Sequence, residues 1–181
     1  MLLYFACLGA GFIIVEISLM QRFILFLGHP IYSTTVILFS LLVFCGIGSR
    51  ITNYFNLKKL KNYLIIIIAG IALLLFIYNY LLTPLFHSLL GINILGRISM
   101  AIILLIPLGL LMGMPFPVGI KIIDKKANKM IPWVWGINGS MSVLGSIVAV
   151  ILAISSGFGF ALITGLCIYL GALVFSTVTS Y

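Results

Sequence analysis

Long apolar runs separated by short polar joints dominate the pattern of this chain. A helix needs about 20 apolar residues to cross the hydrocarbon of a bilayer, and six runs approach that length. They predict transmembrane helices over residues 2–20, 31–50, 63–82, 97–118, 134–155 and 158–178. The expected fold class is therefore an all-α integral membrane bundle, a single six-helix transmembrane domain over 1–181.

The joints carry helix-breaking or water-facing residues. They are Gly28 to Pro30, the Lys-bearing segment 53–62, Thr83-Pro84, the polar segment 121–132, and Ser155 to Gly157. The residue before a proline disfavours helix, so Thr83 is expected to end the third helix. A β-barrel needs about 10 residues of apolar–polar alternation per strand. Segment 64–76 is apolar on every side, and only a helix satisfies its own backbone there.

Composition and charge support this reading. Hydrophobic residues make up 64% of the chain and charged residues 7%, which excludes an ordinary soluble domain. The net charge of +8 would suggest nucleic acid in a soluble protein, but here it reports orientation. Eight of the ten basic residues lie in or next to two joints: Arg50, Lys58, Lys59 and Lys61, then Lys121, Lys125, Lys126 and Lys129. The positive-inside rule then predicts that these joints and both termini lie in the cytoplasm. The expected location is the inner (plasma) membrane, which the chain crosses several times, and the lipid bilayer is its first expected partner.

Glu16 is one of only two acidic residues, and it lies inside the first apolar run. A carboxylate near the middle of a bilayer costs roughly 2.5–3.5 kcal/mol on insertion scales. It is either a structural carboxyl, paired or protonated, or a site for a proton, cation or substrate. The polar residues that we group with it are Gln21, Arg22, Arg97 and Asn138. Three of them, Arg22, Arg97 and Asn138, are its candidate partners.

Small residues and prolines mark contacts and bends between helices. Small residues four apart let helix backbones approach closely, as in the pairs Gly109 and Gly113, Gly136 and Ser140, and Gly145 and Ala149. Pro107, Pro115 and Pro117 fall in or near the fourth run, where a proline bends or ends a helix. Pro115 and Pro117 are either a simple helix stop or a broken helix that lines a cavity. Trp133 and Trp135 are expected to anchor the fifth helix at the membrane interface.

Chemistry of other kinds has few candidates. His29 and His87 lack metal-ligand spacing, and the three cysteines are scattered in apolar contexts. There is no nucleotide-binding loop, so we expect no catalytic residue, metal or cofactor in this chain. Any soluble catalysis would belong to another domain or chain.

Three segments together resemble a known family. GFIIVEISLMQRFILFLGHPIYSTTVILFSLLVFCGIGSR, LLMGMPFPVGIK and IPWVWGINGSMSVLGSIVAV are similar to the membrane region of bacterial spermidine-synthase-like proteins. Those proteins often join membrane helices to a soluble aminopropyltransferase-like domain, which this sequence does not contain. The matching positions are Glu16, Gln21, Arg22, Gly28, His29, Pro30, Pro115, Phe116, Pro117, Trp133, Trp135, Asn138 and Gly139.

Three functional hypotheses follow. The resemblance implies a membrane module that anchors or serves an aminopropyltransferase-like domain or partner and handles polyamines. Six helices with buried polar residues are also typical of half a secondary transporter. The third hypothesis is a structural subunit of a larger membrane complex, with the small residues at subunit contacts.

Overall fold

A computed structural model describes residues 1–178, together with the side chains of 1–124 and 129–176. The side chains of Lys125 and Lys126, which the charge argument counted, lie outside that part. The elements are α1 (Leu2–Leu27), α2 (Pro30–Ile51), the short 3-10 helix η1 (Thr52–Tyr54), α3 (Leu60–Leu89), α4 (Ile94–Met112), α5 (Pro115–Ala127), η2 (Asn128–Met130), α6 (Ile131–Ser156) and α7 (Phe158–Val178). Residues 1–178 contain no strand.

The all-α bundle predicted from the sequence is confirmed. Six segments of the described chain are helical, long and apolar enough to cross a membrane, with α4 and α5 together forming the fourth. These six segments indicate a multi-pass membrane protein whose outer surface contacts lipid. The last segment has the predicted bounds, and α2 differs from its prediction by one residue at each end.

Two predicted breaks between helices are wrong. The third helix does not end at Thr83, because α3 continues through Pro84 to Leu89. The polar segment 121–132 is not an open connector, because α5 occupies it as far as Ala127 and α6 begins at Ile131. In both places the backbone stays helical where sequence chemistry favoured a break.

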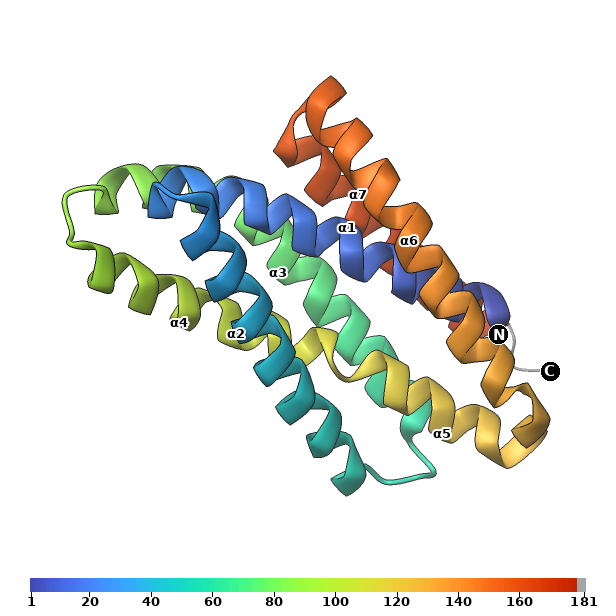
Figure 1. Ribbon diagram of the computed structural model, residues 1–181. Helices are drawn as coiled ribbons and strands as arrows, with labels where there is room; N and C mark the ends of the chain where they lie inside the picture. The colour runs from blue at the N-terminus through green and yellow to red at the C-terminus, as the bar shows by residue number, and fades with distance from the viewer. Residues whose placement is uncertain (179–181) are drawn as a thin grey trace.

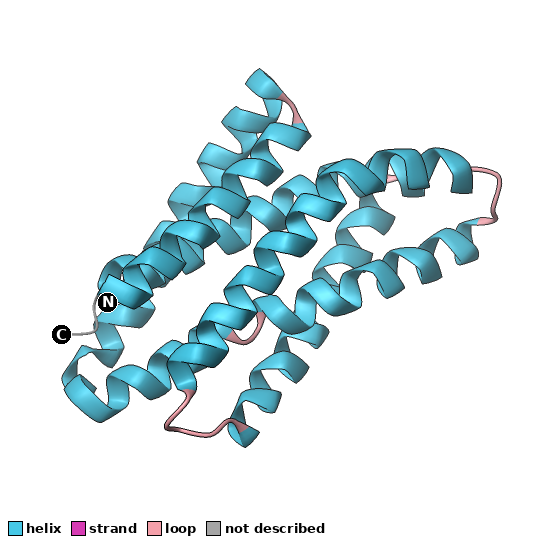
Figure 2. Ribbon diagram, turned by 180° about the vertical axis from the view of Figure 1, so that it is seen from behind, coloured by secondary structure: helices cyan, strands magenta, loops and turns pink. Residues whose placement is uncertain are grey.

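Helix α1 is the centre of the bundle. Helices α6 and α7 pack along it on one side, and α2 and α4 pack against each other on the other side (Figure 1). Helix α3 contacts α7 and α4, which closes the bundle from behind (Figure 2). Both termini lie at the end of the bundle that carries α5, and the α1–α2 and α3–α4 joints lie at the opposite end (Figure 1).

Glycines set the closest helix contacts. A methyl group on Gly48 of α2 would overlap the carbonyl of Leu110, and one on Gly113 would overlap the carbonyl of Cys45. A Cβ on Gly109 would lie 2.8 Å from the Cβ of Phe44. Gly109 and Gly113 therefore both lie at the close contact between α2 and α4.

Helix α6 uses only part of its small-residue pattern inside this chain. A Cβ on Gly145 would lie 2.9 Å from the Cα of Ala10 on α1, so this glycine packs as predicted. Gly136 has open space around it, and Ser140 is exposed. The pair Gly136 and Ser140 therefore does not pack against another helix in the described part of the chain, contrary to expectation.

Candidate functional site

The break between α4 and α5 shapes a cavity. Helix α4 passes through Pro107 and ends at Met112, and α5 begins at Pro115 with Pro117 in its first turn. A proline is well tolerated in a first turn, where its missing N–H has no helical partner to lose. The two prolines therefore start a new helix, as the broken-helix interpretation predicted.

A cleft of about 530 Å³ lies beside this break, and we call it the α4–α5 cleft. Its lining comes from α1, α2, the break, α6 and α7. The lining residues are Leu8, Gly9, Phe12, Leu42, Cys45, Gly46, Ser49, Met112, Gly113, Phe116, Pro117, Trp135, Asn138, Ser142 and Tyr169. This volume falls in the range of about 300–1,000 Å³ that is typical of small-molecule sites.

Aromatic contacts hold the start of α5 against α1 and α6. The hydroxyl of Tyr4 donates a 2.8 Å hydrogen bond to the carbonyl of Pro115. The ring of Phe116 packs edge-on against Phe5 at 5.3 Å and against Trp135 at 4.6 Å between centroids. Trp135 therefore forms a wall of the cleft; its expected role as an interface anchor, with Trp133, remains a prediction.

Polar groups face the same space. Asn138 Nδ2 donates to the carbonyl of Phe5 at 3.0 Å, and Ser142 Oγ donates to the carbonyl of Asn138 at 2.9 Å. The side chain of Asn138 keeps its oxygen and one N–H for other partners. Tyr169 is only 1% exposed, and its hydroxyl makes no hydrogen bond with the described residues. The cleft thus combines aromatic walls with several available hydrogen-bonding groups.

Glu16 does not line the cleft, but it lies one helical turn after Phe12, a lining residue of α1. It continues the α1 stripe of Leu8 and Phe12 at four-residue spacing, one turn closer to the middle of the helix. Its side chain is 5% exposed and is close enough to Cys45, a cleft residue, to interact with it electrostatically. Among the described residues it has no hydrogen bond or ion pair, so a costly buried carboxylate is left for another partner.

The partners expected for Glu16 bond elsewhere. Although α1 and α6 do touch, Asn138 meets α1 at Phe5, about three turns from Glu16. Arg97 donates to the carbonyls of Phe26, Ile92 and Leu90, which fixes the end of α1 to the α3–α4 joint. Neither pairing with Glu16 occurs.

Arg22 also turns away from Glu16. Its Nη1 donates to the carbonyls of Tyr78 and Asn79, at 3.2 Å each, and its Nη2 donates to Asn79 Oδ1 at 2.6 Å. Gly159 of α7 leaves room for this contact, because a Cβ there would lie 3.0 Å from Nη2. Gln21 is half-buried without a hydrogen bond to the described residues, so the predicted polar group around Glu16 is dispersed.

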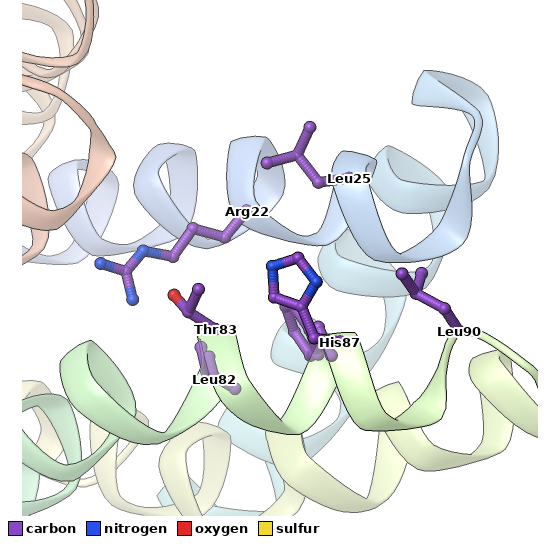
Figure 3. A pocket seen from close by; sticks show the side chains of 7 residues that line it. Arg22, Leu25, Leu82, Thr83, His87 and Leu90 are labelled. Atoms are coloured by element: carbon purple, nitrogen blue, oxygen red, sulfur yellow. The ribbon is translucent and has the colours of Figure 1, made fainter.

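A second pocket lies between α1 and α3 at the opposite end of the bundle. Its volume is about 230 Å³, and we call it the α1–α3 pocket. Figure 3 shows Arg22, Thr83 and His87 at this pocket beside the apolar side chains of Leu25 and Leu90. The other histidine, His29, instead caps α2 by accepting a bond from the Ile31 N–H. No group of three metal-ligating side chains occurs among the described residues.

The sequence reasoning missed Tyr169. It sits near the middle of α7 (Phe158–Val178), although tyrosines of membrane helices concentrate at the two interfaces. A tyrosine at mid-helix was therefore the available signal for a buried polar site. Cys45 carried no comparable signal, because a cysteine in an apolar run reads as a small hydrophobe.

Comparisons with protein families, curated proteins and solved structures found no match to this chain. The features of the chain that bear on its function are the cleft, the buried polar groups and the resemblance of its motifs to the membrane region of spermidine-synthase-like proteins.

Proposed function

We propose that this chain is the membrane module of a spermidine-synthase-like system, and that its α4–α5 cleft binds a small organic amine of the polyamine type. The module would anchor or serve an aminopropyltransferase-like domain or partner. The observation that carries the proposal is Glu16, a buried carboxylate without a described counter-ion beside an aromatic cleft. The partner and the polyamine class come from the resemblance described above.

The chemistry of the cleft suits an alkyl ammonium. An ammonium group is attracted to the faces of aromatic rings by roughly 0.5–2 kcal/mol, and Trp135 and Tyr169 both line the cleft. An ammonium that reached Glu16 would also supply the missing opposite charge. The alkyl chain between amines would contact apolar lining such as Leu8 and Met112. A polyamine thus has a complementary surface for each of its parts.

Orientation is part of the proposal. The positive-inside rule favours a cytoplasmic position for both termini, α5 and the Lys-bearing joint 55–59. The cleft contains Leu8 near the start of α1 and Ser49 near the end of α2, so it lies in that half of the bundle. A cytosolic enzyme would then meet the membrane on the side where the cleft lies.

Half of a secondary transporter is the second candidate. A discontinuous helix beside a binding cavity is a recurring feature of transporters, and the α4–α5 break provides one. The structural-subunit hypothesis is favoured by a different observation, the unpacked Gly136 and Ser140 on α6. The transporter would move the amine across the membrane, whereas the proposed module would only bind it; a structural subunit would need no amine site.

Spermidine binding to the purified protein in lipid nanodiscs tests the proposal. The variant Glu16→Gln removes the buried charge and keeps the side-chain shape, and we expect it to weaken binding roughly tenfold or more, because a charged hydrogen bond contributes about 1.5–3 kcal/mol. Asp124→Asn is the matched control, since Asp124 is the only other acidic residue and is exposed. Calorimetric titration of both variants gives the comparison.

The outcome separates the candidates. Equal affinity in wild type and Glu16→Gln, or equal affinity for spermidine and a neutral diol of the same length, would overturn the amine site. Uptake of labelled spermidine by proteoliposomes that contain only this chain would favour the transporter. Binding without uptake would favour a module that serves a partner.

A further inference from the structure

The α1–α3 pocket is a second polar site, separate from the α4–α5 cleft. It lies at the opposite end of the bundle, between the last turns of α1 and α3. Two of its polar side chains, Thr83 and His87, make no hydrogen bond with the described residues and are exposed (Figure 3). The third, Arg22, is half-buried.

Arg22 keeps part of its donor capacity. A guanidinium has five N–H donors. Two on Nη1 and one on Nη2 go to Tyr78 and Asn79, which leaves the Nε–H and the second Nη2–H. A guanidinium edge with two available donors matches the paired oxygens of a phosphate or carboxylate. The free donors therefore favour an anionic ligand.

Charge in this region is also uncompensated. Both acidic residues of the chain are elsewhere: Asp124 is on α5 at the other end, and Glu16 makes no ion pair with Arg22. Arg97 adds a second guanidinium nearby, since it donates to the carbonyl of Leu90, a residue that lines the pocket. The neighbourhood is thus cationic without a described counter-ion.

The remaining walls of the pocket are apolar, and Arg22 lies at about the level of the lipid headgroups. Leu25, Leu82 and Phe86 form these walls, and Leu25 is 73% exposed. Helix α1 has 26 residues, so at 1.5 Å each it is roughly 39 Å long and exceeds the hydrocarbon core of about 30 Å. Arg22 lies five residues before the end of α1, close to the level where hydrocarbon meets headgroups.

We propose that the α1–α3 pocket binds a phosphate-bearing amphiphile of net negative charge, with the phosphate on Arg22 and His87 and an acyl chain along Leu25 and Phe86. Arg22 also ties α1 to α3, so an occupied pocket would strengthen that contact. The bound lipid would therefore stabilise the bundle at the end opposite to α5.

Thermal unfolding of the detergent-purified protein tests this site. Phosphatidylglycerol is expected to raise the melting temperature more than phosphatidylcholine does, and inorganic phosphate is expected to have little effect. Arg22→Gln should weaken the apparent affinity for phosphatidylglycerol roughly tenfold, the size of a lost charged hydrogen bond. Arg50→Gln is the matched control, because Arg50 is exposed at the other end of the bundle.

Arg22→Gln also removes bonds to α3, so two gentler variants accompany it. His87→Gln breaks no hydrogen bond among the described residues, and Leu25→Trp adds bulk at an exposed position of the pocket. Both should fold and should bind phosphatidylglycerol several-fold more weakly. Equal stabilisation by the two lipids would overturn the site, as would unchanged affinity in His87→Gln and Leu25→Trp. An effect of inorganic phosphate equal to that of the lipid would overturn the amphiphile assignment.

Discussion

At the scale of residues, the two charged side chains of α1 have different surroundings. Arg22 is surrounded by acceptors on α3, just before the position where Pro84 withholds an N–H from the helix. Glu16 has no such neighbours among the described residues. Arg22 therefore holds two helices together, whereas Glu16 has no such structural partner among the described residues.

The glycines of α2 give a direct test of helix packing. Gly48→Ala places a methyl against the Leu110 carbonyl and should destabilise the protein by about 1–3 kcal/mol, the usual cost of overpacking. Gly46→Ala on the same helix meets open space and gains up to about 1 kcal/mol of helix propensity. Melting temperatures in detergent should thus move in opposite directions. A shift of the same sign in both variants would contradict the close α2–α4 contact.

The sequence predicted the burial of charged residues but not their partners. That Glu16 is buried could be predicted, because its position inside an apolar run sets its depth. Its surroundings could not, because the partner of a membrane charge depends on which helix faces which. Asn138 meets Phe5 and not Glu16 for this reason: the register between α1 and α6 is set by contacts at Gly9 and Gly145.

At the scale of elements, α5 is held to α2 as well as to α1. Lys121 Nζ donates to the Thr52 carbonyl at 2.7 Å, to Thr52 Oγ1 at 3.2 Å and to Asn53 Oδ1 at 3.0 Å. The lysine thereby supplies positive charge at the end of α2, where helix carbonyls lack partners. This contact links two of the helices that line the α4–α5 cleft.

Replacing that lysine should loosen the joint after α2. Lys121→Gln is expected to increase hydrogen exchange in residues 52–59 and to lower the melting temperature by a few degrees, since it removes a charged hydrogen-bond donor. Lys59→Gln removes the same charge from an exposed side chain and should leave exchange unchanged. Exchange mass spectrometry of the two variants distinguishes a specific contact from a general charge effect. Identical profiles would show that Lys121 does not hold α2.

Whether a proline ended a helix depended on the packing around it. Pro84 was expected to end a helix, yet α3 continues because packing against α1 and α4 supports its last turns; Phe86, for example, stacks on Phe26 at 4.3 Å. Pro115 coincides with a real break because two prolines and Gly113 follow one another within five residues. Single-residue preferences thus predict an interruption only where tertiary contacts do not override them.

At the scale of the whole molecule, the proposed orientation can be measured by labelling. Cysteines 7, 45 and 167 are first replaced by alanine, and single cysteines are introduced by Lys58→Cys and Gly91→Cys. The thiol introduced at position 58 should react with an impermeant maleimide only from the cytoplasmic side, and the thiol introduced at position 91 only from the other side, because these joints lie at opposite ends of the bundle. The reverse pattern would overturn the orientation and would place the α4–α5 cleft in the outer half.

The central position of α1 has a consequence for the biogenesis of this protein. Its main neighbours, α6 and α7, leave the ribosome after the other described helices, and about a hundred residues separate Leu27 from Ile131. At roughly 5–20 residues per second, the first helix waits about 5–20 s before either arrives. During that interval a carboxyl-bearing helix stands among lipids without the surfaces that later enclose it. We therefore expect that the nascent chain needs the insertion machinery, or a proton on Glu16, to keep α1 in the bilayer until α6 and α7 pack against it.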